Sequence, residues 1–291
     1  MNIQELGDKA NEIREDIIKM LVEAGSGHSA GPLGMADVFT ALYFGGVLTY
    51  KASDPWWEER DRMVLSAGHI VPVLYPVLAH AGFFPHKEIF TLRKINSRLQ
   101  GHPHYKSVPG IENSAGPLGQ GTSVAVGVAL ALKMKHKEKE ITRLPRVICV
   151  TGDGELDEGQ CWEAFMFAAK NNLDNLTFVT DRNHIQIDGY TEEVMPLGNL
   201  KGKMESFGLS AHEVDGHNMQ ALLDVFSLDQ AVHRKPMAII ANTIPGKGVG
   251  YMENLPEWHG KPPKEPGEAV EAIKDIHNIR TLGGKIIGEH E

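Results

Sequence analysis

The residues best suited to chemistry lie in the segment VTGDGELDEG, residues 150 to 159, where Asp153 stands between two glycines after an apolar run. Glycines at a strand end let a ligand approach the backbone, and the helix that follows offers free N–H groups to a phosphate. A carboxylate at the same place would repel a phosphate unless a divalent cation lay between them. We therefore interpret the segment as a site for a di- or polyphosphate bridged by a metal ion.

Asn183 supplies a second candidate ligand, thirty positions after Asp153 and directly after the next apolar run. Its amide oxygen and the backbone carbonyl of Ile185 are placed to join the Asp153 carboxylate around one ion. Three such oxygens, two phosphate oxygens and a water complete the octahedron that Mg²⁺ prefers. Gly-Asp-Gly is also a common turn and Asp a common helix cap, so the triplet alone does not establish the site.

Five short apolar runs predict the elements that position these residues, because strands buried on both faces are typical of a parallel sheet. Segments with helical periodicity lie between the runs and give the alternating βαβ pattern of an α/β fold with helices on both faces of the sheet. Ligands of such sheets bind beyond the carboxyl ends of the strands, where the glycine-rich, histidine-rich loops of this chain fall. The predicted strands span residues 62–66, 146–152, 175–181, 211–216 and 237–243.

The chain reads as one large domain over residues 1–260, followed by a charged C-terminal tail over 261–291. Near the N-terminus, Leu6, Ile13, Ile17, Met20 and Leu21 share one face at three- and four-residue spacing, which predicts an amphipathic helix that packs on the core. The tail opens with prolines, and we expect it to lie on the surface with one helix near 267–276.

Composition excludes several classes of protein. The formal charge is −9 with no long block of one sign, which argues against a polyanion-binding surface. Cys149 and Cys161 both lie in apolar segments and give neither a disulfide framework nor a zinc site. Because the sequence also shows no signal-peptide pattern and no apolar run long enough for a membrane span, we expect a cytoplasmic protein.

Six motifs, in this order, make the chain resemble the N-terminal half of transketolase, from about residue 10 to about residue 263. This resemblance implies the thiamine diphosphate-binding fold, with thiamine diphosphate and Mg²⁺ or Ca²⁺ as cofactors. It also implies transfer of a two-carbon ketol unit from a ketose phosphate to an aldose phosphate. The motifs are GSGHSAGPLGMADV (25–38), LSAGH (65–69), GHPHYKSVPGIENSAGPLGQG (101–121), TGDGELDEG (151–159), DRNHIQIDG (181–189) and WHGKPP (258–263).

The resemblance assigns roles to particular residues. It implies that Asp153, Asn183 and the Ile185 carbonyl hold the metal ion, and that His69 and the Gly154 amide contact the diphosphate. Further positions match residues beside the cofactor rings (Gly116 and Leu118), a glutamate at the subunit contact that links two active sites (Glu158), and histidines that contact the sugar and move protons (His28, His102 and His259).

The histidine assignments have a chemical basis, because ketol transfer moves protons on and off hydroxyl groups and imidazole titrates near the working pH. A zinc site at His102 and His104 is an alternative that lacks further ligands at suitable spacing. His104 also stands where the family more often has an acidic residue. We interpret the remaining histidines as surface or packing residues; they are His80, His86, His136, His217, His233, His277 and His290.

By this resemblance, a complete site needs a glutamate against the aminopyrimidine of thiamine, which the family takes from a pyrimidine-binding domain that we expect to lie outside this sequence. The resemblance thus implies a split enzyme, in which a second subunit carries that domain and an α₂β₂ assembly traps the cofactor between unlike chains. The alternatives are a subunit of a related thiamine enzyme, such as one similar to 1-deoxyxylulose-5-phosphate synthase, and a non-catalytic cofactor-binding subunit.

Overall fold

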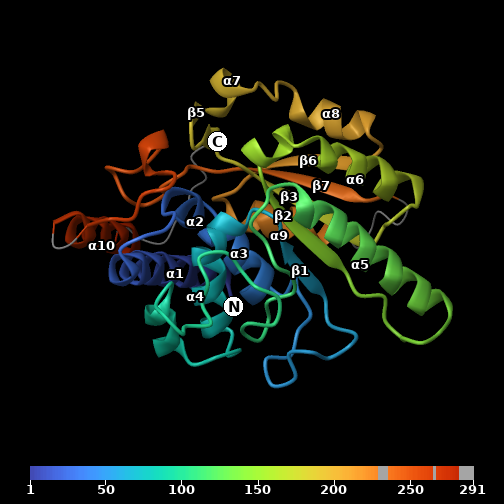
Figure 1. Cartoon of the computed structure of the whole chain (residues 1–291), viewed down its shortest axis with the longest axis horizontal. Helices are drawn as coiled ribbons and strands as arrows, with labels where there is room; N and C mark the ends of the chain where they lie inside the picture. Colours follow the sequence, from blue (N-terminus) through green and yellow to red (C-terminus); the bar gives the residue numbers. More distant parts are fainter. Residues whose placement is uncertain (229–234, 265–266, 282–291) are drawn as a thin grey trace.

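The centre of the molecule is a five-stranded parallel sheet with the strand order β1-β2-β3-β7-β6. The computed structural model describes residues 1–228, 235–264 and 267–281 (Figure 1). All five predicted strands are confirmed, and each begins and ends within one residue of the expected position. The strands are β1 (Arg62–Leu65), β2 (Val147–Gly152), β3 (Leu176–Arg182), β6 (Ser210–Asp215) and β7 (Met237–Asn242).

The register of the sheet brings the strand ends that carry polar residues to one edge. Val150 of β2 lies between Leu65 of β1 and Val179 of β3, and Val179 pairs in turn with Ile239 of β7. Because all these strands run in the same direction, the loops after them meet at the carboxyl edge of the sheet. This edge is where the sequence predicts the ligands.

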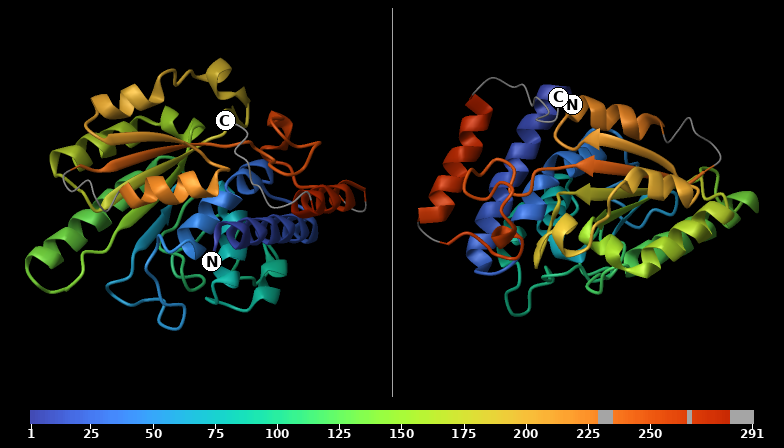
Figure 2. Two further views of the ribbon diagram at one scale, coloured as in Figure 1. Left: turned by 180° about the vertical axis from the view of Figure 1, so that it is seen from behind. Right: turned by 90° about the horizontal axis from the view of Figure 1, so that it is seen from above.

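Helices cover both faces of the sheet, as predicted (Figures 1 and 2). Side chains along each strand alternate between the two faces, so Cys149 of β2 lies in one hydrophobic cluster and Val150 in the other. The first face is covered by α5 (Gln120–Lys137), α6 (Gly159–Lys170) and α8 (Leu200–Ser206). The second face is covered by α1 (Ile3–Ala24), α3 (Ala36–Phe44), α4 (Val71–His80) and α9 (Met219–Leu228).

Short elements connect these layers and shape the carboxyl edge. Glycine, proline and polar residues interrupt regular structure in these segments, so most of the elements are short. They are the α-helices α2 (Ala30–Gly34) and α7 (Thr191–Val194), the 3₁₀ helices η1 (Gly68–Ile70), η2 (His86–Thr91), η3 (Gly154–Asp157) and η4 (Pro256–Trp258), and the strands β4 (Ile185–Gln186) and β5 (Gly189–Tyr190).

The N-terminal helix α1 forms as its sequence predicts. Asn2 and Glu5 make a reciprocal capping box at its start, and Gly25 ends it in the left-handed conformation with φ of 63°. Its predicted apolar face is fully buried in the core. The helix therefore gives a fixed support for the segment around residue 28.

The C-terminal segment differs in part from the expected surface tail. Residues Gly267–Thr281 form α10, which is longer than the predicted helix and lies beside α1. Ala272 and Ile276 are fully buried there, because small and aliphatic residues at four-residue spacing give α10 an apolar face. The boundary at residue 260 stays a prediction, and His233 and His290 lie outside the described residues.

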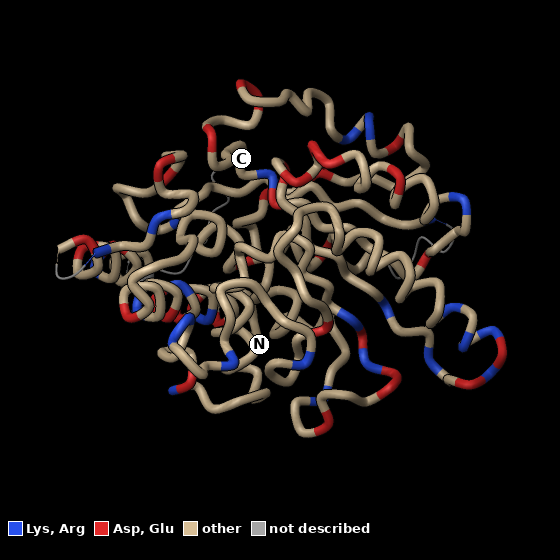
Figure 3. The backbone as a smooth tube through the Cα atoms, viewed as in Figure 1, with Lys and Arg blue, Asp and Glu red and all other residues tan. Residues whose placement is uncertain are grey.

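Charged residues of both signs are interspersed along the described chain (Figure 3), in agreement with the absence of a long basic or acidic block in the sequence. Within the described residues, no helix combines the length and the hydropathy that a membrane span requires.

Candidate active site

A cavity of about 350 Å³ lies at the carboxyl edge of the sheet. It is lined by loops that follow β1, β2 and β3, together with segments far away in the sequence. Every residue to which the sequence assigns a role contributes to its wall except Glu158. The predicted residues that line the cavity are His28, His69, His102, Gly116, Leu118, Asp153, Gly154, Asn183, Ile185 and His259.

Asp153 stands at the tip of β2 and is only 1% exposed. Its Oδ1 accepts a hydrogen bond from the Gly154 N–H at 2.8 Å. Its Oδ2 accepts from the His184 N–H at 2.8 Å and from the Arg182 guanidinium at 3.0 Å. Burial raises the pKa of Asp153, although Arg182 and these hydrogen bonds oppose the rise. The carboxylate is thus fixed in place, and a cation would relieve the cost of burying its charge.

Asn183 is oriented by a second carboxylate, Asp181. Its Nδ2 donates to Asp181 Oδ2 at 2.8 Å, and its Oδ1 accepts from the Ile185 N–H at 3.0 Å. Burial raises the pKa of Asp181 to about 7, and the charge of Asp153 adds to the rise against the hydrogen bond from Thr243. Asp181 also lines the cavity, although the sequence analysis gave it no role. Hard oxygen atoms from two neighbouring strand ends therefore meet at this point.

Three histidines form a cluster on another part of the wall. The ring centroids of His28 and His69 lie 5.1 Å apart, those of His69 and His259 5.2 Å, and those of His28 and His259 5.7 Å. Burial, with like charges nearby, lowers the pKa of His28 to about 4 and that of His69 well below its usual value. Burial also lowers the pKa of His259. The rings are therefore neutral at physiological pH, so each can donate one proton and accept another.

Two buried nitrogen atoms of this cluster, the Nδ1 atoms of His28 and His259, make no hydrogen bond within the described residues. An unpaired buried polar atom is costly, and in a cavity wall it indicates a position for a ligand atom. The cluster is therefore prepared for polar groups of a bound molecule.

His102 lies half-buried at the border of the cavity, beside a cation that the sequence analysis missed. Burial, followed by the charge of Arg93, lowers the pKa of His102. A Cβ added to Gly101 would lie 2.6 Å from Arg93 Nε, so glycine there lets the guanidinium approach. The sequence gives no signal for this contact, because Arg93 follows neither a strand nor a glycine. It lies beside His102 only because of the turn after η2.

Gln186 is a further residue that the sequence analysis missed. Its buried Nε2 has no partner in the described part of the chain, and its side chain lines the cavity beside Gly154. A Cβ added to Gly154 would lie 2.8 Å from Gln186 Oε1, so a side chain there would require Gln186 to move. The available signal was its place in the loop after β3, one residue beyond the predicted ligand Ile185.

Glu155 holds three loops of the cavity together from behind. It is 2% exposed, and its Oε1 accepts from the Gly119 N–H at 2.7 Å and from the Ser66 hydroxyl at 2.5 Å. Its Oε2 accepts from the Gly152 N–H at 3.1 Å. Gly121 allows the close approach, because a Cβ there would lie 2.5 Å from Ser66 Cα. Glu155 is thus a positioning residue that sequence spacing did not reveal.

Two expectations concern residues that do not line the cavity. Glu158 is exposed and precedes α6, beside Gly119, which leaves it on the surface where a second chain can reach it. His104 is also exposed, and within the described residues it forms no three-ligand group with His102. The structure therefore gives no support to the alternative zinc site, while the role of Glu158 stays a prediction.

The family model described as transketolase, thiamine diphosphate binding domain, matches residues 7–280. The chain belongs to this family. The match covers almost all of the described structure, including α10, and confirms the family that the six motifs predicted. The fold inferred from that resemblance, a parallel α/β sheet of the thiamine diphosphate-binding type, is also confirmed.

Relatives of this transketolase-family chain fall into two groups by length. It is 42% identical over 250 residues to the 6-deoxy-6-sulfo-D-fructose transketolase subunit SqwG of Clostridium sp. (strain MSTE9), covering 86% of this chain and 88% of that one. It is 37% identical over 278 residues to an apulose-4-phosphate transketolase subunit of Actinobacillus succinogenes, covering 94% and 98%. It is 40% identical to the transketolase of Pongo abelii, covering 95% of this chain but only 42% of that protein.

Solved transketolase structures give the same picture. The transketolase of Campylobacter jejuni superposes with a TM-score of 0.88 at 32% identity, over 97% of this chain and 43% of that one. The transketolase of Leishmania mexicana superposes with a TM-score of 0.87 at 30% identity, over 97% and 41%. This chain thus spans about two fifths of those transketolases, and nearly the full length of relatives named as subunits.

The cavity fits the diphosphate end of the family's cofactor. The buried Gln186 Nε2 is a donor that has no partner among the described residues, and phosphate oxygens are acceptors only. Gly154 lines the cavity between Asp153, to which its N–H donates, and the side chain of Gln186. Asp153 and Asn183 supply the hard oxygen atoms that Mg²⁺ or Ca²⁺ would need. The donor set therefore agrees with a metal-bridged diphosphate.

Proposed function

We propose that this chain is the thiamine diphosphate-binding subunit of a two-subunit transketolase, which transfers a two-carbon ketol unit between sugar phosphates (EC 2.2.1.1). The observation that carries the proposal is one cavity that combines the Asp153 and Asn183 oxygens with a neutral histidine cluster. The relatives named as transketolase subunits, which have nearly the same length, support the division of the enzyme between two chains.

Thiamine diphosphate, when bound, supplies a thiazolium carbon that cleaves the bond beside a ketose carbonyl and carries the two-carbon fragment. In our proposal Asp153, Asn183 and the Ile185 carbonyl hold Mg²⁺ or Ca²⁺. His69 and the Gly154 amide contact the diphosphate, while Gly116 and Leu118 lie beside the rings. All of these residues line the cavity.

The histidines of this chain move protons on the sugar. His28 and His259 are neutral, and each has a buried nitrogen that no described residue contacts through a hydrogen bond, so either can take a proton from a sugar hydroxyl or return one. His102 stands at the border, with Arg93 beside it, where the anionic end of a sugar phosphate can be received. The protein thereby accommodates both ends of its substrate.

The same proposal requires a partner that brings the activating glutamate in its pyrimidine-binding domain. Helices α5 and α6 pack side by side and expose large apolar residues on their outer surfaces. Val124 is 43% exposed, Met166 53% and Phe167 45%. Burial of such side chains against another chain is favourable. We place a subunit contact on this surface, next to Glu158, within an α₂β₂ assembly in the cytoplasm.

The relatives named as transketolase subunits carry different sugar substrates in their names. The Arg93 guanidinium beside His102 can donate hydrogen bonds to a phosphate or to a sulfonate alike, since both present anionic oxygen atoms. We therefore propose a ketose with a terminal oxyanion as the donor class.

The test is to purify this chain alone and together with candidate second subunits, and to assay ketol transfer with several ketose phosphate donors. We expect negligible turnover alone and activity with the correct partner. The Asp153→Ala variant serves as the matched control and should lose metal-dependent cofactor uptake in calorimetry. Full turnover by the single chain would refute the two-subunit proposal. Cofactor binding without turnover beside any partner would favour a non-catalytic subunit instead.

A further inference from the structure

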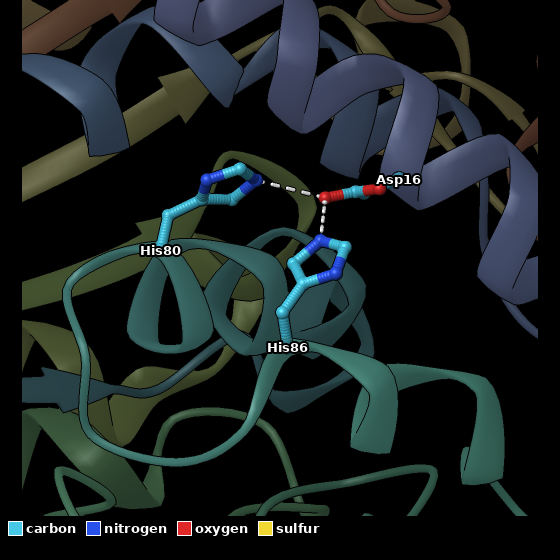
Figure 4. Close-up of side chains that lie close together, drawn as sticks. All are labelled: Asp16, His80 and His86. Carbon is cyan, nitrogen blue, oxygen red and sulfur yellow. Dashed lines mark hydrogen bonds and ion pairs between the residues drawn. The ribbon is translucent and has the colours of Figure 1, made fainter.

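A second cluster of possible metal ligands lies outside the cavity, between α1, α4 and η2 (Figure 4). His80, the last residue of α4, directs Nε2 to Asp16 Oδ2 at 2.8 Å. His86, the first residue of η2, directs Nε2 to the same oxygen at 2.6 Å. The two imidazole rings lie with centroids 5.0 Å apart. One carboxylate and two imidazoles thus converge from three separate elements.

The geometry of these groups is close to what a metal ion requires. One ligand atom from each of Asp16, His80 and His86 lies within 4.8 Å of the other two. Ligands at roughly 2.0–2.1 Å around a tetrahedral Zn²⁺ stand about 3.3–3.4 Å apart. The Asp16 oxygen lies 2.8 Å and 2.6 Å from the two imidazole nitrogens, so these three groups must move apart slightly to admit the ion.

We propose that Asp16, His80 and His86 form a binding site for a divalent transition-metal ion of the zinc class, with water at the remaining positions. Two imidazoles select zinc-like ions over Mg²⁺ and Ca²⁺, which prefer oxygen ligands alone. Access is open, because the His86 side chain is 44% exposed while that of Asp16 is 10% exposed. None of the three residues lines the cofactor cavity.

Lys9 is the neighbour that opposes metal binding. Its Nζ lies 3.4 Å from His80 Nδ1, and it is paired with Glu12 on the same helix. A neutral His80 that binds a metal through Nε2 must carry its proton on Nδ1, which then faces the lysine ammonium. Lys9 must therefore turn toward Glu12 and solvent when the site is filled. Its removal should tighten metal binding.

The place of the site in the fold gives it a consequence. α4 begins directly after η1, which contains His69 of the cavity, and η2 leads to Arg93, whose charge acts on His102. A metal that joins the far end of α4 to α1 and η2 therefore fixes the support of both residues. We expect a filled site to stabilise the native chain by mass action, since the unfolded chain lacks the assembled ligands.

The test is titration of the metal-free full-length chain with ZnCl₂ in the presence of Mg²⁺, by calorimetry and by metal analysis after desalting. His86→Gln and His80→Ala should each lose one bound Zn²⁺ relative to the wild type. The affinity for Zn²⁺ should fall by more than the roughly 10- to 100-fold that is typical when a residue hydrogen-bonded to a metal ligand is replaced. His136→Ala, an exposed histidine on α5, is the matched control and should keep the wild-type stoichiometry. Circular dichroism verifies that each variant is folded.

Co²⁺ provides a second readout, because its visible absorption reports ligation by imidazole. The wild type should develop this spectrum in a step that His86→Gln lacks, and Lys9→Met should bind Zn²⁺ more tightly than the wild type. Equal zinc stoichiometry in the wild type, His80→Ala and His86→Gln would overturn the proposal. Asp16 and the two histidines would then be a hydrogen-bonded ionic cluster without a metal.

Discussion

The Arg182 guanidinium donates to Asp153 Oδ2 at 3.0 Å and also pairs with Glu192 of α7. A protein cation therefore already neutralises the carboxylate to which we assign the metal. Oδ1 of Asp153 accepts only the short-range hydrogen bond from Gly154 among the described contacts, so it is the oxygen available to an ion. Arg182 and the metal thus share one carboxylate, and each weakens the attraction of the other.

We predict that Arg182→Ala increases the affinity for Mg²⁺ in the presence of thiamine diphosphate. The gain should be roughly tenfold or more, because a cation beside a carboxylate changes its proton affinity by about 1–3 pKa units. Calorimetric titration of Mg²⁺ at a fixed cofactor concentration measures the change. Arg182→Lys keeps the charge and should stay near the wild type. Weaker cofactor uptake in Arg182→Ala would mean that Arg182 itself contacts the ligand.

Glu155 gives a prediction about the rigidity of the cavity. Glu155→Gln replaces one carboxylate oxygen by an NH₂ group, which cannot accept, so either the Gly152 N–H or the Gly119 N–H and the Ser66 hydroxyl lose their partner. A buried donor left without a partner costs about 1–3 kcal/mol, so the free energy of unfolding should fall by that amount. Urea denaturation of the isolated chain provides the measurement. Glu158→Gln, at a neighbouring exposed position, should change it by less than about 0.5 kcal/mol.

The histidine cluster gives a prediction about proton binding. Since burial and the charges of His259, His102 and Arg93 lower the pKa of His28 to about 4, its ring should stay neutral from pH 7.5 to pH 5. NMR of the ring nitrogens in the isolated chain observes this directly. His259→Ala removes a like charge and part of the burial, so the pKa of His28 should rise in that variant. Titration of wild-type His28 near the ordinary histidine value of about 6.5 would contradict the arrangement.

Much of the fold could be predicted because its strands are continuous apolar runs. Segments such as RVICVTG lose water on both faces, so composition and length alone predict a buried strand. The cavity followed from the same rule, since Asp153 and Asn183 each come directly after such a run. Family resemblance then added residues such as His259, which no periodicity connects to His28.

Other parts of the site depend on contacts that the sequence does not express. Glu155 and Gln186 act through hydrogen bonds to backbone groups or through a buried unpaired amide, and neither has a spacing that reveals this. Arg93 reaches His102 because of a turn with φ of 59°. The histidines expected on the surface or in packing include His80, which meets Asp16 only when α1 and α4 are packed together.

A buried ionic cluster behind the sheet edge gives the last prediction. Asp37 accepts from the Arg14 guanidinium at 2.5 and 3.2 Å and from His217 Nδ1 at 2.8 Å. His217 Nε2 in turn accepts from the Ile244 N–H at 2.8 Å, so the cluster ties α1 and α3 to the loop after β7. All three charged or polar side chains are at most 3% exposed. Asp37→Asn should lower the free energy of unfolding at pH 7 by about 3–5 kcal/mol, because it leaves Arg14 buried without a counter-ion.

The pH dependence of that loss is specific. Burial alone would raise the pKa of Asp37, but the charge of Arg14 and the hydrogen bond from His217 outweigh it and lower the pKa to about 2, below the unfolded value of 3.8. The native chain then binds this proton less readily than the unfolded chain, so the stabilisation is complete above about pH 4 and is lost as the pH falls toward 2. Urea denaturation between pH 7 and pH 3 should show that the difference in the free energy of unfolding between wild type and Asp37→Asn becomes smaller in acid. Asp54→Asn, a change at an exposed position, is the control and should have the same free energy of unfolding as the wild type at each pH. A difference between wild type and Asp37→Asn that stays constant with pH would show that Asp37 stabilises the fold by packing rather than by charge.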